Sequence, residues 1–233
     1  MNPKYLVLFD IDGTLVLTGR AGMRAMNRAC EETVGHANAL NGVAVAGRTD
    51  WIILHDVMAN HGLSLDDVHL EELRRLYVTH LADEIVLPGE GVKDVMPGIR
   101  ELLDRLHGRS DVALGLLTGN FEDGARIKLE YFDLWKYFPV GAFGGDSPDR
   151  NALVPVALGR ARDRGIADLP TARVLVVGDT PHDVACAHAV GAVAVAVATG
   201  GYTVDQLRET RADYVFKDLS DIEAFLKLVG GSA

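Results

Sequence analysis

Carboxylates follow two apolar segments of the chain, at positions where they could act together. Asp10 and Asp12 end an apolar run that begins at Tyr5, and Asp179 ends a second run just after Gly178. Side chains two residues apart on a strand share a face, so Asp10 and Asp12 can reach one pocket. An alternative is that the Asp-Gly pair at residues 12–13 only forms a turn. Three converging acids would repel one another without a divalent cation, and their hard oxygen ligands suit Mg²⁺.

A hydroxyl and an amide follow a third apolar run. Thr118, Gly119 and Asn120 precede a helix that we expect to begin near Phe121. A hydroxyl together with the free N–H groups of a turn and a helix N-terminus forms an anion site. The alternative is that Thr118 or Asn120 caps this helix.

The apolar runs predict the elements that must position these side chains. Five runs are rich in Val, Leu and Ala, and a sixth is a candidate: residues 5–11, 112–118, 140–143, 173–178, 192–199 and 214–216. Near-continuous apolarity is typical of parallel strands that are buried on both faces. Helical periodicity lies between the runs from about residue 90 onward. The pattern predicts a doubly wound, mostly parallel α/β sheet with ligands at the carboxyl ends of its strands.

A helical insertion is predicted after the first strand. Residues 20–34, 50–61 and 66–82 show helical apolar spacing, and about a hundred residues there show no convincing strand. Residues 87–92 have the composition of a linker. We therefore expect a small α-helical cap domain at residues 15–88, with an α/β core made of residues 1–14 and 89–233.

Composition excludes several classes of protein. The chain has 233 residues with 33 acids and 23 bases, a net charge of −10 and a pI near 5.2. This balance argues against nucleic acid or an anionic membrane as a partner. Two cysteines rule out a disulfide framework. The longest aliphatic run, at residues 192–198, is too short to cross a bilayer, and the N-terminus does not look like a signal peptide, so a cytoplasmic location is expected.

Three segments together resemble a known family. Residues 10–14, Thr118 and residues 178–183 resemble three of the four motifs of the haloacid dehalogenase superfamily, in order and spacing. The inserted helices resemble the small cap of its phosphoglycolate phosphatase-like branch. The resemblance implies a Mg²⁺-dependent phosphatase. Such an enzyme would hydrolyse a small phosphorylated metabolite, a phosphoglycolate-like phosphomonoester, through an aspartyl-phosphate.

The resemblance also implies roles for single residues. Asp10 would be the nucleophile, and Asp12 would protonate the leaving oxygen and then activate water. Thr118, with Gly119 and Asn120 beside it, would hold the phosphoryl oxygens. The implied chemistry is sound, because a carboxylate attacks an anionic phosphate only when a metal and cationic donors screen the charge.

The implied metal ligands are also acids of the strand ends. Asp10, the backbone carbonyl of Asp12 and Asp179 would hold Mg²⁺. Asp183 would support the loop that carries Asp179, although Asp183 also suits the first turn of a helix in any protein.

The third motif departs from the family, which has a lysine about thirty residues after the threonine. Here Arg150 lies 32 residues past Thr118 and is assigned the role of that lysine, between nucleophile and phosphate. The alternative is an exposed arginine at the start of a helix. Lys128 and Lys136 come too early for this register, so both are expected on a solvated face.

Substrate specificity is expected from the cap. Arg48 and Thr49 resemble the cap loop that touches the substrate in related phosphatases, although Thr49 would equally suit the cap of a helix. Phosphoglucomutase-like phosphoryl transfer would use the same core motifs, and a catalytically weak regulatory or binding protein on the same fold is a further alternative. Monomer and homodimer remain open.

Overall fold

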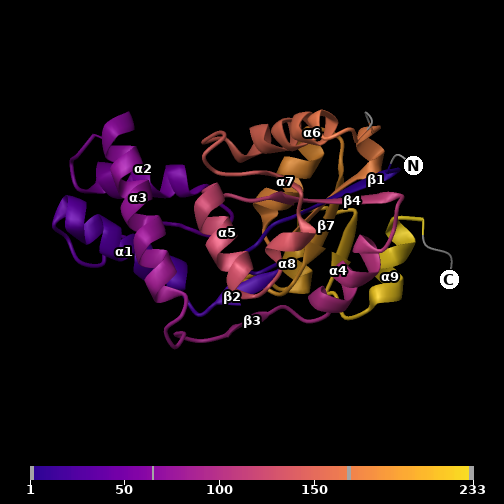
Figure 1. Ribbon diagram of the computed structural model, residues 1–233, viewed down its shortest axis with the longest axis horizontal. Coiled ribbons are helices and arrows are strands. Elements are labelled where there is room, and N and C mark those ends of the chain that lie inside the picture. The colour runs from indigo at the N-terminus through magenta and orange to yellow at the C-terminus, as the bar shows by residue number, and fades with distance from the viewer. Residues whose placement is uncertain (1–2, 65, 167–168, 231–233) are drawn as a thin grey trace.

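The protein has an α/β core at one end and a group of three helices at the other (Figure 1). The computed structural model describes residues 3–64, 66–166 and 169–230. Within this part of the chain, no helix is both long and apolar enough to span a bilayer. The cytoplasmic location stays a prediction.

A six-stranded sheet forms the centre of the core. Its strands are β1 (Tyr5–Phe9), β4 (Val112–Leu117), β5 (Val140–Ala142), β6 (Val174–Gly178), β7 (Val193–Val197) and β8 (Tyr214–Phe216). They lie in the order β5-β4-β1-β6-β7-β8, and every pairing is parallel. The doubly wound α/β prediction is confirmed, and so is the sixth strand.

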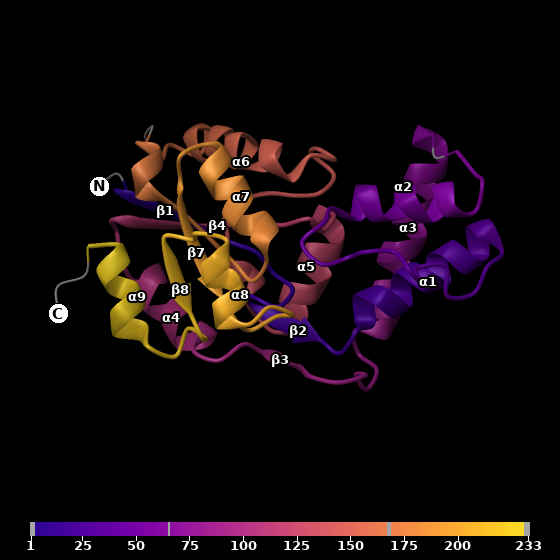
Figure 2. The same ribbon diagram turned by 180° about the vertical axis from the view of Figure 1, so that it is seen from behind.

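Helices cover both faces of this sheet (Figure 2). One face carries α4 (Ile99–His107), α5 (Glu122–Tyr131) and α9 (Ile222–Leu228), and the other carries α6 (Leu153–Asp163), α7 (Pro181–Ala189) and α8 (Val204–Glu209). Short 3₁₀ turns lie at η1 (Trp135–Tyr137), η2 (Arg150–Ala152) and η3 (Thr171–Arg173). The strand residues alternate between two apolar clusters: Val7 and Phe9 belong to the first, Leu6 and Leu8 to the second. Burial on both faces explains why these strands show no polar alternation in the sequence.

The three predicted helices of the insertion are present and share a core of their own. They are α1 (Ala21–Val34), α2 (Asp50–Asn60) and α3 (Asp67–Glu84). Each of the three helices contributes to one buried apolar cluster, for example through Ala25, Leu54 and Tyr77. Phe121 of the α/β core belongs to the same cluster. The cap therefore packs on the core through an aromatic ring next to the Thr118 turn. The domain limits of 15 and 88 stay a prediction.

Two short strands connect the core to the cap. β2 (Val16–Thr18) pairs antiparallel with β3 (Lys93–Val95). The expectation of no strand in the hundred or so residues between the first strand and the run at residues 112–118 is wrong for both β2 and β3. Three residues are too few for a periodic pattern to develop, so periodicity could not predict this pair of strands.

The sheet order places the ends of three strands together. β1 lies between β4 and β6, and the chain reaches these neighbours through crossovers on opposite sides of the sheet. In such sheets the crevice outside the carboxyl ends of the central strands is the place where ligands bind. Asp10, Thr118 and Asp179 each follow one of these three strands directly.

Candidate active site

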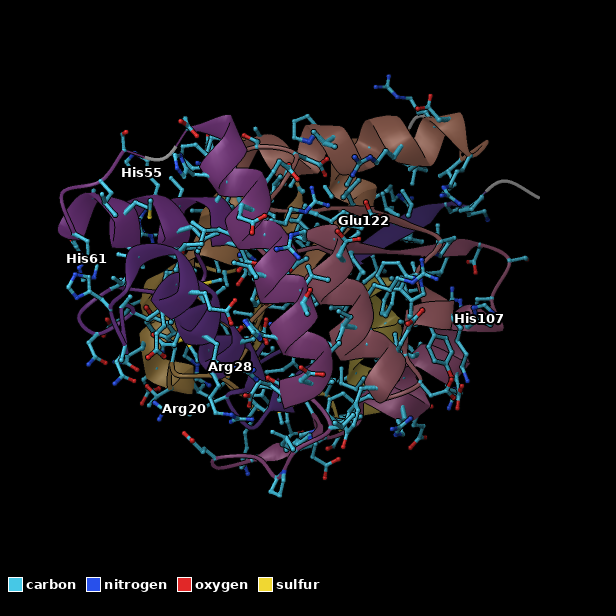
Figure 3. All side chains as sticks on the ribbon, turned by 60° about the vertical axis from the view of Figure 1, so that its left-hand side comes forward. Arg20, Arg28, His55, His61, His107 and Glu122 are labelled. Carbon is cyan, nitrogen blue, oxygen red and sulfur yellow. The ribbon has the colours of Figure 1, made fainter. Side chains whose placement is uncertain are left out.

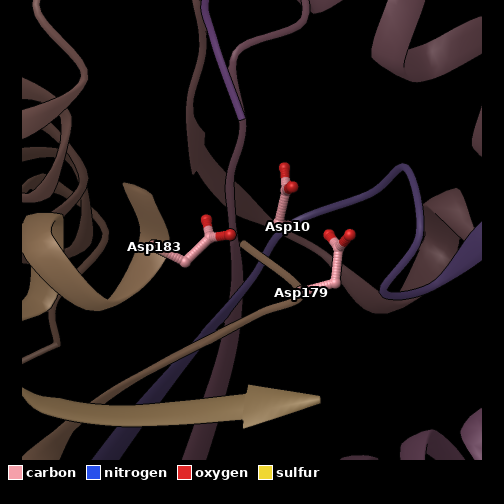
Figure 4. Close-up of side chains that lie close together, drawn as sticks. All are labelled: Asp10, Asp179 and Asp183. Carbon is pink, nitrogen blue, oxygen red and sulfur yellow. The ribbon is translucent and has the colours of Figure 1, made fainter. Parts of the chain in front are cut away.

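Three buried aspartates meet at the strand ends. Asp10 follows β1, Asp179 follows β6, and Asp183 lies in the first turn of α7. One carboxylate oxygen from each lies within 4.8 Å of the other two (Figure 4). Among the described residues, these three form the single group of at least three histidine, cysteine or acidic side chains that could hold a metal. The predicted convergence is present for Asp10 and Asp179 but not for the carboxylate of Asp12, which contacts Lys128 and Asn120 instead. Asp183 takes the third place in the group.

Within the described chain, no histidine belongs to this group. Figure 3 shows His55 and His61 on the cap and His107 at the far end of the core.

Glycines make room for the acids. A Cβ on Gly178 would lie 2.0 Å from Cγ of Asp183, and one on Gly13 would lie 2.6 Å from Oδ2 of Asp179. Gly13 also has a φ of +82°, which side chains with a Cβ rarely adopt. Any other residue at these two positions would move a carboxylate.

Burial and mutual repulsion make the acid cluster hard to ionise. Burial, together with the charges of Asp10 and Asp183, raises the pKa of Asp179 to about 8. Burial also raises the pKa of Asp10 to about 6, with Arg150 acting against the rise. The cluster therefore has more carboxylates than one arginine can neutralise, and a proton or a cation is needed to balance the excess negative charge.

Arg150 supplies the positive charge in the described part of this cluster. Its Nη2 lies 3.3 Å from Oδ1 of Asp10 and also pairs with Asp183, and its Nη1 donates to the carbonyl of Gly47 at 3.2 Å. The side chain is only 8% exposed, so the alternative of an exposed arginine at a helix start does not hold. Burial would lower its pKa, but the two carboxylates hold that pKa above its usual range. Its Nε is buried without a hydrogen-bond partner among the described residues.

Asp183 is fixed at the start of α7. Its Oδ2 accepts hydrogen bonds from the backbone N–H of Thr180 at 3.0 Å and from its hydroxyl at 2.8 Å. Asp179 accepts one from the hydroxyl of Thr14 at 3.3 Å. These contacts keep both carboxylates oriented toward the strand ends.

The Thr118 turn is not a helix cap. The N-cap residue of α5 is Phe121, and no side-chain hydrogen bond caps this helix. The backbone N–H of Phe121 donates to Oδ2 of Asp50 at 2.9 Å. The Thr118 hydroxyl oxygen instead accepts from Nδ2 of Asn120 at 2.8 Å. Its own proton is left to donate, which is what a phosphoryl oxygen requires.

Lys128 lies in the site, and its assignment to a solvated face is wrong. The side chain is 6% exposed, and Nζ lies 2.6 and 2.8 Å from the two carboxylate oxygens of Asp12. It also donates to Oδ1 of Asn120 at 2.6 Å, and Nδ2 of Asn120 donates to Asp12 at 2.9 Å. Lys128 falls on the buried face of α5 with Ala125 and Leu129. A lysine on the apolar face of a predicted helix was the signal that could have identified it.

Lys136 behaves as expected. Its side chain is 56% exposed and pairs with Asp133 at 2.5 Å. It therefore lies away from the acids.

A cap loop reaches down to the Thr118 turn. The backbone N–H of Asp50 donates to the carbonyl of Gly119 at 2.7 Å, and the Thr49 hydroxyl donates to the carbonyl of Pro148 at 3.2 Å. Thr49 also caps α2, as its alternative role predicts, by accepting from the N–H of Ile52. A Cβ on Gly119 would lie 2.1 Å from the carbonyl oxygen of Arg48, so only glycine permits this approach.

Arg48 and Asp50 have different surroundings in this loop. The guanidinium of Arg48 binds Asp56 at 2.7 Å and the carbonyl of Ala44 at 2.9 Å. Burial raises the pKa of Asp50 to about 6, while Lys128 and the N–H of Phe121 act against the rise. Asp50 was missed at the sequence level, because an acid in the first turn of a helix is ordinary.

The site residues line one cavity of about 480 Å³ between the strand ends and the cap. All but two of the predicted site residues border it: Asp10, Asp12, Arg48, Thr118, Gly119, Asn120, Arg150 and Asp179. The exceptions are Thr49 and Asp183, which lie behind its wall.

Fold and site together define a class of α/β enzymes with buried aspartates at the carboxyl ends of a parallel sheet. The family model described as "Haloacid dehalogenase-like hydrolase" matches residues 7–197, and the chain belongs to this family. It is therefore a hydrolase.

Similar proteins agree with this assignment. The chain is 28% identical over 230 residues to a protein of Dickeya dadantii named "Probable phosphatase IndB", covering 97% of this chain and 96% of that one. It is 28% identical over 225 residues to a phosphoglycolate phosphatase of Rhodospirillum rubrum, covering 94% and 90%. A solved hydrolase from Pseudomonas syringae shares the fold with a TM-score of 0.68 at 23% identity, covering 96% and 98%. Family and relatives support a phosphoric monoester hydrolase.

Proposed function

We propose that this protein is a Mg²⁺-dependent phosphatase of a small phosphorylated metabolite and that it works through an aspartyl-phosphate on Asp10. The observation that carries the proposal is the position of Asp10, at the floor of the cavity between Arg150 and Asp179. The phosphatase names of the relatives support the same activity.

The donor set fits magnesium. Asp10, Asp179 and the backbone carbonyl of Asp12 would hold the ion, with Asp183 fixing the loop beside them. All are hard oxygen donors, and the raised pKa values of Asp10 and Asp179 mark a site that lacks positive charge. When bound, Mg²⁺ supplies charge that screens the carboxylates from the phosphate.

The phosphoryl group would be held from two sides. The Thr118 hydroxyl and the N–H groups of the turn through Gly119 and Asn120 donate from one side. Arg150 donates from the other, where its buried Nε still lacks a partner within the described chain. These donors would stabilise the negative charge that builds up as the phosphoryl group is transferred.

The two aspartates at the end of β1 divide the chemistry. An oxygen of Asp10 attacks phosphorus, and the bond between phosphorus and the ester oxygen breaks. Asp12 gives a proton to the departing alkoxide, then takes one from the water that attacks the aspartyl-phosphate. Lys128 and Asn120 hold the Asp12 carboxylate through their hydrogen bonds. Release of phosphate restores Asp10.

The cap loop would set specificity. Arg48 lines the cavity, and Thr49 fixes the loop against the core. Several relatives are named phosphoglycolate phosphatases, so phosphoglycolate is the first natural compound to test.

The experiment measures release of p-nitrophenol from p-nitrophenyl phosphate with Mg²⁺, with a chelator, and with Mg²⁺ restored. We expect activity that disappears with the chelator and returns with the ion. Activity that is indifferent to the chelator contradicts the metal proposal. Conversion of a hexose phosphate to its isomer, dependent on a bisphosphate activator, would instead indicate the mutase alternative.

A further inference from the structure

The cavity is larger than a phosphoryl group requires. Its volume of about 480 Å³ lies in the range that whole small-molecule ligands occupy in proteins. The groups proposed to hold the phosphoryl group, Thr118 and Arg150, border it at the strand ends. The remaining space lies under the cap and would receive the alcohol part of the ester.

Apolar side chains form the wall of this second space. They come from five separate segments: Leu17 on β2, Met23 and Met26 on α1, Val45 in the cap loop, Ile53 on α2 and Val92 before β3. Met26 and Ile53 are each 4% exposed and belong to the apolar cluster of the cap. The wall is therefore anchored in a packed core. Two methionines let such a wall adapt to ligands of different shape.

The charges on this side do not favour a second anion. Two of the lining cations come from the cap, Arg20 and Arg48. The guanidinium of Arg48 is engaged by Asp56 and the carbonyl of Ala44. Arg20 is exposed and lies at the outer edge of the molecule in Figure 3.

Two acids line the same side, Asp50 and Glu90. A carboxylate placed under the cap would therefore lose water and meet hydrocarbon and like charge, which is costly without a partner.

We propose that the natural substrate is a phosphomonoester of an apolar alcohol, aliphatic or aromatic, with no second anionic group. This rests on the proposed phosphatase function and narrows its substrate. The hydrocarbon would pack on Met23, Met26 and Ile53 while the phosphoryl group reaches Asp10. Selectivity for such esters would come from burial of hydrocarbon, which each added methylene increases.

A homologous series of substrates tests the proposal. The compounds are ethyl, butyl and hexyl phosphate, whose leaving groups are chemically alike, together with phosphoglycolate and a hexose phosphate. We expect kcat/KM to rise about fourfold for each buried methylene, a total of about 250-fold over the four methylenes from ethyl to hexyl phosphate. Phosphoglycolate and the hexose phosphate should stay below hexyl phosphate. A flat series, or preference for either polar compound, overturns the proposal.

Binding separates this proposal from the catalytic one. The same compounds are titrated calorimetrically into the Asp10→Asn protein with Mg²⁺, where no turnover is expected. Tighter binding of hexyl phosphate than of phosphoglycolate supports the apolar space even if the native protein hydrolyses nothing. Equal affinity contradicts it even if the native protein is an active phosphatase.

A charge placed in the wall gives a further test. Met23→Lys should lower kcat/KM for hexyl phosphate at least about tenfold and raise it for phosphoglycolate. Leu63→Lys is the matched control, because Leu63 is a cap residue that is 44% exposed and does not line the cavity. Melting temperatures near that of the native protein show that both variants are folded. If Met23→Lys leaves the ratio of kcat/KM for the two substrates unchanged, Met23 does not contact the substrate and the proposal fails.

Discussion

The two ends of the cavity are built in opposite ways. At the strand ends, charged side chains such as Asp10, Arg150 and Asp179 are buried and fixed by contacts of 3.3 Å or less. Under the cap, the wall consists of side chains such as Met23 and Val45, which make apolar contacts. The geometry of the first end suits one chemical step. The apolar surface of the second end suits hydrocarbon groups of different shapes. In the proposed function, charge at the strand ends would carry the reaction and burial of hydrocarbon under the cap would carry selectivity.

The largest effect should come from the nucleophile. Asp10→Asn keeps the size of the side chain but removes the anionic oxygen that attacks phosphorus, so turnover should fall below a few per cent for every substrate. Release of phosphate from p-nitrophenyl phosphate and from hexyl phosphate measures it. A variant that keeps substantial activity on either compound would move the reaction away from Asp10.

Arg150 should come next. Arg150→Ala removes a donor to the phosphate and leaves Asp10 and Asp183 without their counter-charge, so kcat should fall about 10²–10³-fold. Arg150→Lys should recover only part of this, because lysine lacks the planar fork. Equal losses on aryl and alkyl phosphates would place the effect at the strand ends. Full activity of Arg150→Ala would contradict its assignment to the third motif.

Lys128 should have a smaller effect. Lys128→Met keeps the length and the burial of the side chain but leaves Asp12 and Asn120 without a charged partner. Loss of a hydrogen bond to a charged group corresponds to about 10–10² in kcat. Lys136→Met is the control, since Lys136 pairs with Asp133 on the surface. Equal activity of the two variants would mean that Asp12 needs no support from α5.

Asp50 connects the two ends, and its substitution should change stability. Its pKa is raised to about 6, so the folded protein binds the proton more tightly than the unfolded chain does. The stability contribution of Asp50 is therefore full below about pH 4 and is lost as the pH rises through 6. Asp50→Asn can still accept from Phe121 without the buried charge, and should gain roughly 1–3 kcal/mol at pH 8.

Thermal unfolding of Asp50→Asn and of the native protein between pH 4 and 8, both in a chelator, measures this gain. The variant should melt higher at pH 8 and show a smaller fall between pH 4 and 6. A lower melting temperature at pH 8 would mean that the charge itself holds the cap on the core.

Arg48 should give the smallest change. Its guanidinium is occupied by Asp56, so Arg48→Ala should alter kcat/KM for p-nitrophenyl phosphate by less than about threefold, as expected of a partly exposed ion pair. The natural substrate, which occupies the cap side, should be affected more. Equal small changes on both substrates would leave Arg48 with no part in selectivity.

The positions of the residues at the strand ends could be predicted from the sequence because local order creates them. A residue that follows a buried parallel strand must lie at the carboxyl edge of the sheet, so Asp10, Thr118 and Asp179 could be brought together before the structure was known. Arg150 could be placed in the site only by counting residues from Thr118, and its contact with Asp10 fits that placement. Lys128 was missed because its contact with Asp12 depends on how α5 packs under the cap.

The cap side could not be predicted in the same way. Its wall is assembled from β2, α1, the cap loop, α2 and the segment before β3, which meet only after the helices have packed. Met23 and Ile53 look like ordinary core residues in the sequence, and their hydrophobic periodicity predicts a helix but not which side borders a cavity. The three-residue strands β2 and β3 gave no pattern at all.

The cap loop has one more consequence, which concerns how this protein can change over generations. Among the described residues, each hydrogen bond that attaches this loop to the core uses a main-chain atom on at least one side: the carbonyls of Gly47, Gly119 and Pro148 and the N–H of Phe121. The wall that would meet the substrate is made of side chains that take no part in these bonds. Mutations can therefore change the side chains of the wall, and with them the substrate range, without breaking the hydrogen bonds that hold the loop on the core. In this architecture, substrate specificity can evolve while the residues that carry the reaction stay the same.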